Sequence, residues 1–472
     1  MKTNDYLSVT DMFKIGVGPS SSHTLGPWKA ALHWLNRLDT PVELISVKVK
    51  LFGSLSLTGK GHATDKAAIM GLSGLDPAVV EHEKIDEVWN LVLNHKTLFL
   101  GGKWKISFDI DKDLLFTTEF LDYHANAISF IAISRSGVES EDIYYSLGGG
   151  FISKGEEGTN IYDPKSKHPF PISKGAELLA YCHEHQLNIA EVVMANETVY
   201  HSKEEIDRFL LDIWDTMLHS VYRGCHTEGI LPGGLAVKRR APRLIKSVMK
   251  PAYYTDVYAW VEALKQEEAG IHSIFKWLSA FAIAVNEENA AMGRVVTAPT
   301  NGSAGVIPAV LLAYISFYNN KAGKKEIIEF LCVASEIGCI FKKGSTISAA
   351  MGGCQAEIGV SSAMAAAALC HVKRGTPSQC LIAAEIAMEH HLGMTCDPIN
   401  GLVQIPCIER NSMGAIKAIN AAHIALERDP EDIRVPFDKV VKTMWTTAQD
   451  MHRKYKETSE GGLAVAVNEI EC

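Results

Sequence analysis

Three of the ten cysteines occur where the backbone has to turn. Cys354 follows two glycines, Cys396 precedes Asp397 and Pro398, and Cys407 follows Pro406. A thiol at such a break can point into a cavity, and thiolates with neighbouring N–H donors are the ligands of iron–sulfur clusters. Three ligands instead of four would leave one iron open, which is what Lewis-acid chemistry requires. From spacing alone, a metal site is one interpretation of these cysteines and a structural role is the other.

The spacing of the cysteines and the absence of nearby histidines bear on which metal this site could bind. The separations of 42 and 11 residues are wider than a compact ferredoxin motif. Zinc is the alternative metal, but no histidine stands at a standard zinc spacing from these cysteines. Cys332 and Cys339 lie seven residues apart on one predicted helical face among isoleucine and valine, which favours core packing.

Four segments have the composition of anion-binding loops. They combine hydroxyl or glycine residues with the start of a predicted helix or the end of a predicted strand: Ser20–Thr24, Gly61–Lys66, Gly148–Gly150 and Ala298–Ser303. Helix N-termini and backbone nests offer free N–H groups, which favour a carboxylate or a phosphate. For any single segment, helix capping is the simpler interpretation. Four such segments beside a candidate open metal indicate a site for a small acid.

His62, His124 and Lys66 are the titratable groups nearest to these loops. A single histidine is more often structural than catalytic, and His23 has the position of a helix cap. The basic run from Arg239 to Arg243 is interpreted as a solvated face or an interface.

The elements that must position these residues differ along the chain. Residues 45–51, 104–110 and 127–133 have the alternating or continuous apolar patterns of strands. Helices are predicted from Pro27 and over residues 65–70, ending at Gly71. Residues 147–171 are rich in Gly, Ser, Lys, Asp and Pro, which predicts a loop or an interdomain linker.

Beyond this segment the pattern is helical. Ser202 and Glu205 form a capping box, and apolar stripes at helical spacing follow near residues 206–217, 257–264 and 327–337. We therefore expect an α+β protein: a small α/β domain over residues 1–150, a linker over 151–174, and a larger all-α domain over 175–472.

Composition excludes several classes of protein. The 472 residues carry a formal charge of −9, which argues against a nucleic-acid partner. Ten cysteines are too few for a secreted disulfide scaffold, and residues 1–10 lack the pattern of a signal peptide. The apolar run over residues 306–317 is shorter than a membrane span. These features predict a cytoplasmic protein without a membrane partner.

Taken together, the motifs resemble the bacterial iron–sulfur L-serine dehydratases over nearly the whole chain. The matching segments are GVGPSSSHT, TGKGHATDKA, YYSLGGGF, EGILPGGLAVKRRA, APTNGSAGVIPAVL, GGCQAEIGVSSAMAAA and the region of Cys396 and Cys407. The segment His124-Ala125-Asn126 departs from the family's His-Pro-Asn, so its loop is expected to be less rigid.

The resemblance implies a fold, a cofactor and a reaction. The N-terminal domain would bind substrate, and the helical domain would hold a [4Fe–4S] cluster through Cys354, Cys396 and Cys407. The reaction would be the conversion of L-serine to pyruvate and ammonia by a lyase without pyridoxal phosphate. A homodimer is the base-rate expectation for the assembly.

Roles for individual side chains follow from this resemblance. His62 is the first choice for the base that removes the α-proton, with Lys66 second and His124 as a further catalytic candidate. The expected substrate-binding residues are Ser20, Ser21, Ser22, His23, Thr64, Asn126, Ser146, Gly149 and Asn301. Cys472, the last residue, would ligate the open iron when substrate is absent and make the tail self-inhibitory.

Three alternatives remain at this point. A pyridoxal-phosphate dehydratase catalyses the same overall reaction with a Schiff-base lysine, for which Lys66 is a candidate. A non-catalytic amino-acid sensor would use only the N-terminal domain to bind serine. A zinc hydrolase is the weakest alternative, because histidine ligand spacing is missing.

Overall fold

The alternating residues near position 47 form the second strand of a six-stranded sheet. In the computed structural model, which describes residues 6–38, 44–155, 159–160 and 168–467, β2 (Leu44–Phe52) pairs antiparallel with β6 (Asn126–Ser134). The strand order is β5-β2-β6-β7-β8-β9, and β5 (Leu114–Phe116) is parallel to β2. The remaining strands are β7 (Glu139–Ser146), β8 (Ile152–Lys154) and β9 (Thr159–Asn160).

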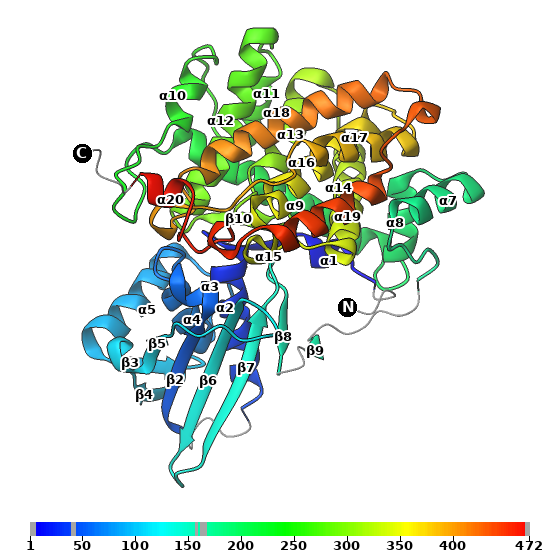
Figure 1. Cartoon of the computed structure of the whole chain (residues 1–472). Helices are drawn as coiled ribbons and strands as arrows, with labels where there is room; N and C mark the ends of the chain where they lie inside the picture. The colour runs from blue at the N-terminus through cyan, green and yellow to red at the C-terminus, as the bar shows by residue number, and fades with distance from the viewer. Residues whose placement is uncertain (1–5, 39–43, 156–158, 161–167, 468–472) are drawn as a thin grey trace.

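Helices cover this sheet, as Figure 1 shows. α2 (Gly26–Asn36) begins close to the predicted start at Pro27, and α4 (Thr64–Leu72) has nearly the predicted bounds. α5 (His82–His95) was not predicted. Trp34 of α2 stacks on Phe130 of β6. Gly71 permits close packing of α4 on α2, because a Cβ there would lie 2.4 Å from the carbonyl oxygen of Trp28. These contacts pack α2 and α4 against each other and against the sheet, and the hydroxyl-rich loops lie directly before the two helices.

A short hairpin accompanies the sheet. It consists of β3 (Thr97–Leu100) and β4 (Trp104–Ser107). The strand predicted to reach residue 110 ends earlier, because Asp109 caps the short helix α6 (Ile110–Asp113).

The second part of the molecule is helical, as predicted. Its main elements are α7 (Gly175–His185), α8 (Ile189–Glu197), α9 (Lys203–His226), α10 (Ala241–Lys246), α11 (Val257–Leu264), α12 (Ile271–Ala290), α13 (Val306–Ala313), α14 (Lys324–Gly344), α15 (Ala349–Gly352), α16 (Ile358–Val372), α17 (Pro377–Glu389), α18 (Cys407–Leu426), α19 (Phe437–Asp450) and α20 (Leu463–Ala466). The predicted capping box of Ser202 is present at the start of α9. α16 is buried on every side and packs against α14, α17 and α18. Its small residues allow this close approach of helices.

Strand pairing joins the beginning of the chain to the helical part. β1 (Lys14–Val17) pairs antiparallel with β10 (Arg294–Thr297), and α1 (Val9–Met12) packs on α14. The helical part thus contains the strand β10. The first described residues, α1 and β1, pack on this helical part before the chain enters the six-stranded sheet. Neither strand was predicted, since four residues are too few to establish alternation.

The segment predicted as a loop after residue 147 is partly regular. β8 and β9 extend the six-stranded sheet at its edge, so the loop prediction is wrong for these residues.

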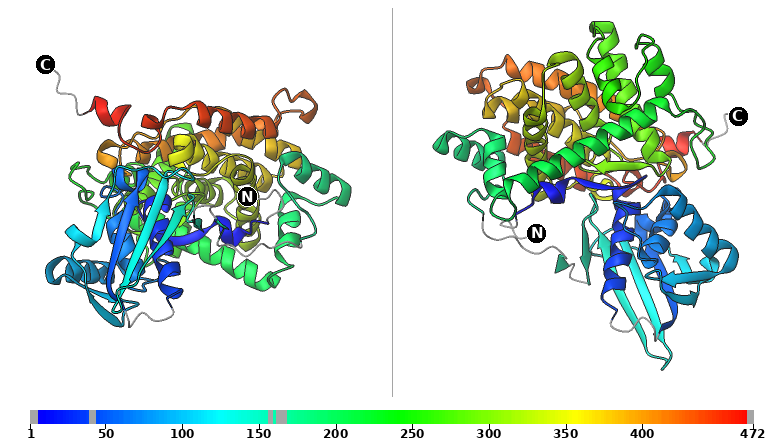
Figure 2. Two further views of the ribbon diagram at one scale, coloured as in Figure 1. Left: turned by 60° about the horizontal axis from the view of Figure 1, so that its bottom comes forward. Right: turned by 180° about the vertical axis from the view of Figure 1, so that it is seen from behind.

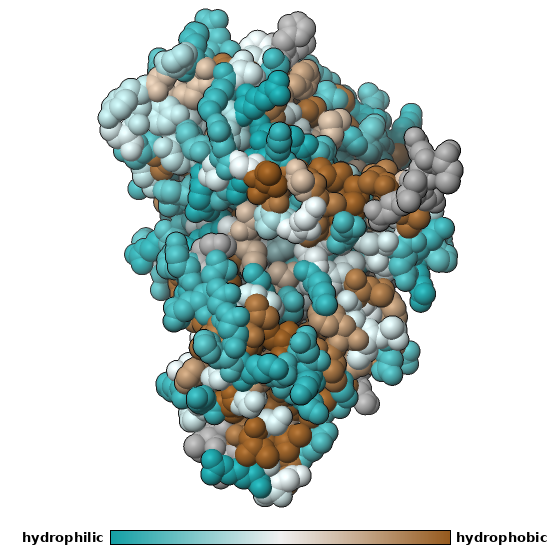
Figure 3. All heavy atoms as spheres, turned by 90° about the vertical axis from the view of Figure 1, so that its left-hand side faces the viewer, coloured by the Kyte–Doolittle hydropathy of each residue, from teal (hydrophilic) through white to brown (hydrophobic). Residues whose placement is uncertain are grey.

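In both views of Figure 2 the sheet lies to one side of the helical part. On the face shown in Figure 3, hydrophobic residues form separate patches among hydrophilic ones. Within the described residues, no helix has both the length and the apolar character needed to span a membrane.

Candidate active site at the junction of the two parts

The serine-rich loop forms a buried turn in front of α2. Residues Ser21–Leu25 adopt a π-helical turn, and Ser20 caps it by accepting a hydrogen bond from the backbone N–H of His23 at 3.1 Å. The hydroxyl oxygens of Ser20 and Ser22 lie 3.1 Å apart. The capping interpretation of this loop is therefore correct, and its hydroxyls are also placed beside an imidazole.

His23 has a tautomer that its neighbours determine. Its Nε2 lies 3.0 Å from the hydroxyl of Ser54, which itself donates to the carbonyl oxygen of Glu457 at 2.8 Å. Since the Ser54 proton is already used, Nε2 must carry a hydrogen and Nδ1 must accept one. Ser22 lies 2.9 Å from Nδ1 and donates to it. Burial lowers the pKa of His23 well below its usual value, which keeps the ring neutral.

His62 presents an unprotonated nitrogen to the side-chain carboxyl group of Glu457. Its Nδ1 donates to the carbonyl oxygen of Thr58 at 3.0 Å, so Nε2 carries the lone pair. That Nε2 lies 3.6 Å from Oε1 of Glu457, and the rings of His62 and His23 are 4.5 Å apart. Burial lowers the pKa of His62 to about 4. His62 is thus neutral at pH 7 and has an accepting nitrogen inside the site.

Glu457 is a central residue that the sequence analysis missed. Its Oε1 lies 3.4 Å from His23 Nδ1, and its backbone N–H donates to the carbonyl oxygen of Cys396 at 2.8 Å. Burial is the main cause that raises the pKa of Glu457, and the nearby Glu357 adds to it. Its sequence signal is weak, because Glu457 is one of two acids in residues 456–462, a segment without periodicity that would distinguish either of them.

Three of the predicted binding residues have side chains without a hydrogen-bond partner among the described residues. These are the hydroxyls of Thr64 and Ser146 and the whole amide of Asn126, all buried. These groups are therefore available to hydrogen-bond a substrate. Asn126 also donates its backbone N–H to His124 Nδ1 at 3.0 Å, and burial lowers the pKa of His124 to about 4.

The glycine loop lies against the serine loop. The backbone N–H of Gly149 donates to the Ser21 hydroxyl at 3.3 Å, and the ammonium group of Lys14 donates to the Gly149 carbonyl oxygen at 2.9 Å. Gly148 has a φ of +80°, and a Cβ there would lie 2.7 Å from the carbonyl oxygen of Ile347. Glycine is therefore required where this loop meets the helical part.

Asn301 and Lys66, two of the predicted site residues, have side chains that are engaged by other parts of the protein. The amide of Asn301 accepts from Thr297 at 2.7 Å and donates to the Val17 carbonyl oxygen at 3.1 Å, which ties the loop to β1. The Lys66 ammonium group lies 5.3 Å from the centre of the Trp89 ring on α5. This contact favours His62 over Lys66 as the base.

The cysteines form the helical side of the junction. Cys354 and Cys396 lie near Glu357, with the three ligand atoms within 4.8 Å of one another. Cys407 begins α18, and all three thiols are buried. Gly353 precedes Cys354 with a φ of +70°, and a Cβ there would lie 2.7 Å from the carbonyl oxygen of Met394.

Arg410 is the cation that faces these sulfurs, one turn after Cys407 on α18. Its guanidinium donates to Cys354 Sγ at 3.2 Å, to the Thr395 carbonyl oxygen at 2.8 Å and to Asp397 at 2.9 Å. The hydrogen bond from Cys396 and then the Arg410 charge lower the pKa of Cys354 to about 6. Burial is the main cause that raises the pKa of Cys407.

This donor set fits an iron–sulfur cluster better than a hard cation. Soft thiol ligands select zinc or iron–sulfur centres, and a guanidinium N–H directed at sulfur stabilises the thiolate form. The backbone bond between Glu457 and Cys396 places this set beside the two imidazoles. Cys472, the predicted fourth ligand, lies outside the described residues.

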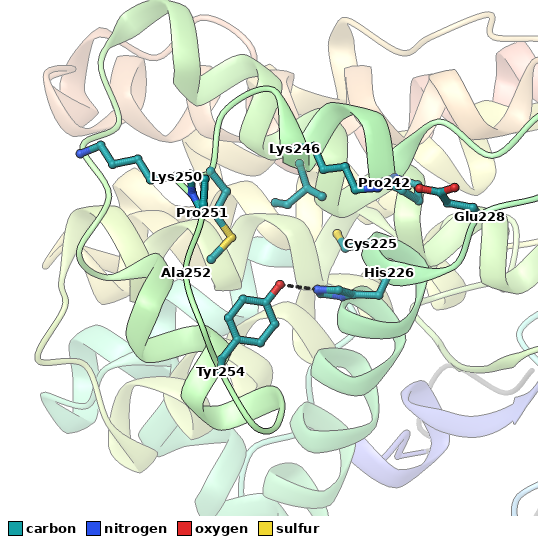
Figure 4. Close-up of a pocket in the computed structure, with 11 residues that line it drawn as sticks. Cys225, His226, Glu228, Pro242, Lys246, Lys250, Pro251, Ala252 and Tyr254 are labelled. Carbon is teal, nitrogen blue, oxygen red and sulfur yellow. Dashed lines mark hydrogen bonds and ion pairs between the residues drawn. The ribbon is translucent and has the colours of Figure 1, made fainter.

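A separate cavity of about 560 Å³ lies between α9 and α10 (Figure 4). Four of its polar side chains are already paired: His226 with Tyr254 at 2.7 Å, and Lys246 with Glu228 at 2.6 Å. Its cysteine, Cys225, is buried, and burial raises the pKa of the thiol. None of the predicted site residues lines this cavity, so we place the candidate site at the junction instead.

Comparison with known proteins assigns the family. The model of the serine dehydratase beta chain matches residues 8–157, and that of the serine dehydratase alpha chain matches residues 184–464. The chain therefore belongs to the serine dehydratase family, which confirms the resemblance.

Curated relatives agree with this assignment. L-serine dehydratase 2 of Escherichia coli is 44% identical, covering 98% of this chain and 99% of the relative. L-serine dehydratase of Streptomyces coelicolor is 45% identical, covering 99% and 100%. L-serine dehydratase of Helicobacter pylori strain 26695 is 43% identical, covering 97% and 98%.

Proposed function

We propose that this chain is an L-serine dehydratase, a lyase that converts L-serine into pyruvate and ammonia. The observation that carries the proposal is the junction at Glu457. Its carboxyl group faces His23 and His62, which belong to the N-terminal part of the molecule. Its backbone N–H is hydrogen-bonded to Cys396, which belongs to the helical part. Full-length similarity to relatives named for this reaction supports the assignment.

Cys354, Cys396 and Cys407 would hold a [4Fe–4S] cluster in this proposal. When bound, it would supply an open iron that acts as a Lewis acid toward the serine hydroxyl, which is otherwise a poor leaving group. Arg410 would hold the thiolates by its charge and by its N–H bond to Cys354.

The protein's own residues would carry the remaining steps. His62 Nε2 accepts the α-proton, because its other nitrogen is committed to Thr58. The hydroxyls of Ser21 and Thr64 donate to the substrate carboxylate and stabilise the charge that builds there. Ser20, Ser22 and Gly149, whose protons bond within the site, hold these loops in place. Asn126 and Ser146 offer the other unpaired groups.

Loss of the α-proton and of hydroxide, which leaves as water after protonation, gives an enamine. The enamine tautomerises to an imine. Water then hydrolyses the imine to pyruvate and ammonia, so no further residue is needed.

Three further parts of the proposal concern the tail, the compartment and the assembly. Cys472 would ligate the open iron in the resting protein and leave when serine binds. Truncation of Cys472 would then remove a lag in the assay and change the resting spectrum.

The nine described cysteines are all free thiols, which supports a reducing, cytoplasmic compartment. We propose a homodimer, which sedimentation would test.

The test of the proposed function is iron and acid-labile sulfide per chain after anaerobic purification, with serine turnover measured on the same sample. About four of each, with pyruvate formed and activity lost in air, is the expected result. Activity without iron and with a yellow imine chromophore would favour pyridoxal phosphate. A sample without iron that binds serine but stays inactive after reconstitution would favour the amino-acid sensor.

A further inference from the structure

A second polar pocket lies between the two parts, outside the group around Glu457. It has a volume of about 300 Å³. One wall is Val80, Glu81 and Ile85 at the start of α5, and the other comes from α9, α12 and β10. This volume is at the lower end for ligand pockets and suits a small organic molecule.

Three guanidinium groups line this pocket: Arg223, Arg239 and Arg294. Glu288 is buried and pairs with two of them, with Arg223 through one oxygen and with Arg239 at 2.5 Å through the other. Glu81 lies 3.6 Å from Arg294, but its side chain is 77% exposed and therefore screened by solvent. The lining thus keeps a net positive charge.

Arg294 has a buried donor that no described residue accepts. One terminal nitrogen donates to the carbonyl oxygens of Val79 and Val80 at 3.1 and 3.0 Å, whereas Nε is buried without a partner. A buried N–H without an acceptor is unfavourable, and one oxygen of a carboxylate would satisfy it with a charge-assisted hydrogen bond.

The remaining wall determines the class of ligand. Val17, Val80, Ile85 and Met292 supply apolar surface beside the guanidinium groups. An inorganic anion would leave this surface in contact with water, whereas a short organic acid would cover it. We propose that this pocket binds a small organic carboxylate with an apolar body, through Arg223 and Arg294.

The pocket also connects to the serine loop. Val17 forms part of its wall, and the next residue, Gly18, donates its N–H to the Gly293 carbonyl oxygen at 3.2 Å. Ser20 follows two residues later. A ligand in the pocket is therefore expected to change the KM for serine, and this coupling, unlike the binding itself, rests on the proposed function.

The probe is 3-methylbutanoate, with binding to the purified full chain followed by isothermal titration or ligand NMR at low salt. We expect saturable binding that is about tenfold weaker in Arg223→Gln. The matched control is Arg208→Gln, which removes an exposed arginine from the same helix, α9, outside the pocket. Inorganic phosphate is the second probe and should bind more weakly than the organic acid.

A second variant avoids disturbing the Glu288 pairs. Ala291→Phe fills the pocket from the end of α12 without removing an arginine and should abolish binding. Binding that is absent in the unaltered protein, unchanged in both pocket variants, or as tight for phosphate overturns the site as stated. Binding without any change in KM overturns only the coupling, and failure of serine turnover leaves the binding result intact.

Discussion

At the scale of single residues, Glu457 contacts both parts of the molecule, through its side chain and through its backbone. Its side chain approaches both imidazoles, and its backbone accepts from Ser54 and donates to Cys396. His23 uses Nε2 as a donor to Ser54, whereas His62 keeps Nε2 unprotonated. Of the two rings, His62 therefore has the free lone pair on the nitrogen that faces the site, which makes it the base in the proposed reaction.

Replacement of His62 tests this assignment. His62→Ala should lower kcat by about 10²- to 10⁴-fold, because a general base contributes that much, while the visible spectrum and iron content stay unchanged. Steady-state pyruvate formation and absorbance on one anaerobic sample measure both quantities. His95→Ala, at an exposed position on α5, is the control. Full turnover in His62→Ala would transfer the role of base to another group.

Arg410 affects the cysteines rather than the proton transfer. Arg410→Gln removes the N–H bond and the positive charge from Cys354, so we expect iron affinity to fall by about 10- to 100-fold. Iron retained per chain during titration with a chelator is the measurement. Lys417→Gln, further along α18, should behave like the unaltered protein. Equal iron retention in both variants would contradict this role.

At the scale of elements, the glycine loop after β7 is held from two sides. The Lys14 ammonium group donates to Gly149 and lies 3.5 Å from the centre of the Phe151 ring, and the ammonium group of Lys342 on α14 lies 3.7 Å from the same centre. Burial lowers the pKa of Lys14 well below its usual value. Lys14 thus acts through Gly149 and positions the loop rather than touching the substrate.

Loss of this support should appear mainly in substrate binding. Lys14→Met is expected to raise the KM for serine about tenfold with a smaller change in kcat, because the carboxylate loop moves while the base stays in place. Lys14→Arg should restore part of the affinity. The control is Lys105→Met on β4, an exposed position. A fall in kcat at unchanged KM would exclude the positioning role.

Local patterns and distant contacts differ in how well the sequence predicts them. The apolar alternation of β2, the capping box of α9 and the turn before α2 follow from neighbouring residues, and the structure contains all three. The Ser54–Glu457 bond spans 403 positions, and the pairing of β1 with β10 joins two four-residue strands. No local pattern determines such contacts, so Glu457 was missed. The three cysteines were singled out because each stands within two residues of a glycine or a proline.

At the scale of the whole molecule, burial of uncharged histidines makes stability depend on pH. Burial lowers the pKa of His62, His124 and His371 to about 4. In the unfolded chain a histidine titrates near 6.5, so between these values the unfolded state binds more protons. The stabilisation is complete above about pH 6.5 and is lost as the pH falls toward 4, by about 1 kcal/mol per histidine at pH 5.5.

His371, near the end of α16 and away from the junction, isolates this effect. Its Nε2 lies 4.0 Å from Glu329, and Arg374 adds to burial in lowering its pKa. In His371→Gln, acidification from pH 7.5 to 5.5 should reduce the free energy of unfolding by about 1 kcal/mol less than in the unaltered protein. Urea titrations at both pH values measure this difference, with exposed His183→Gln as the control. An equal loss in all three proteins would mean that His371 does not take up a proton on unfolding in this pH range.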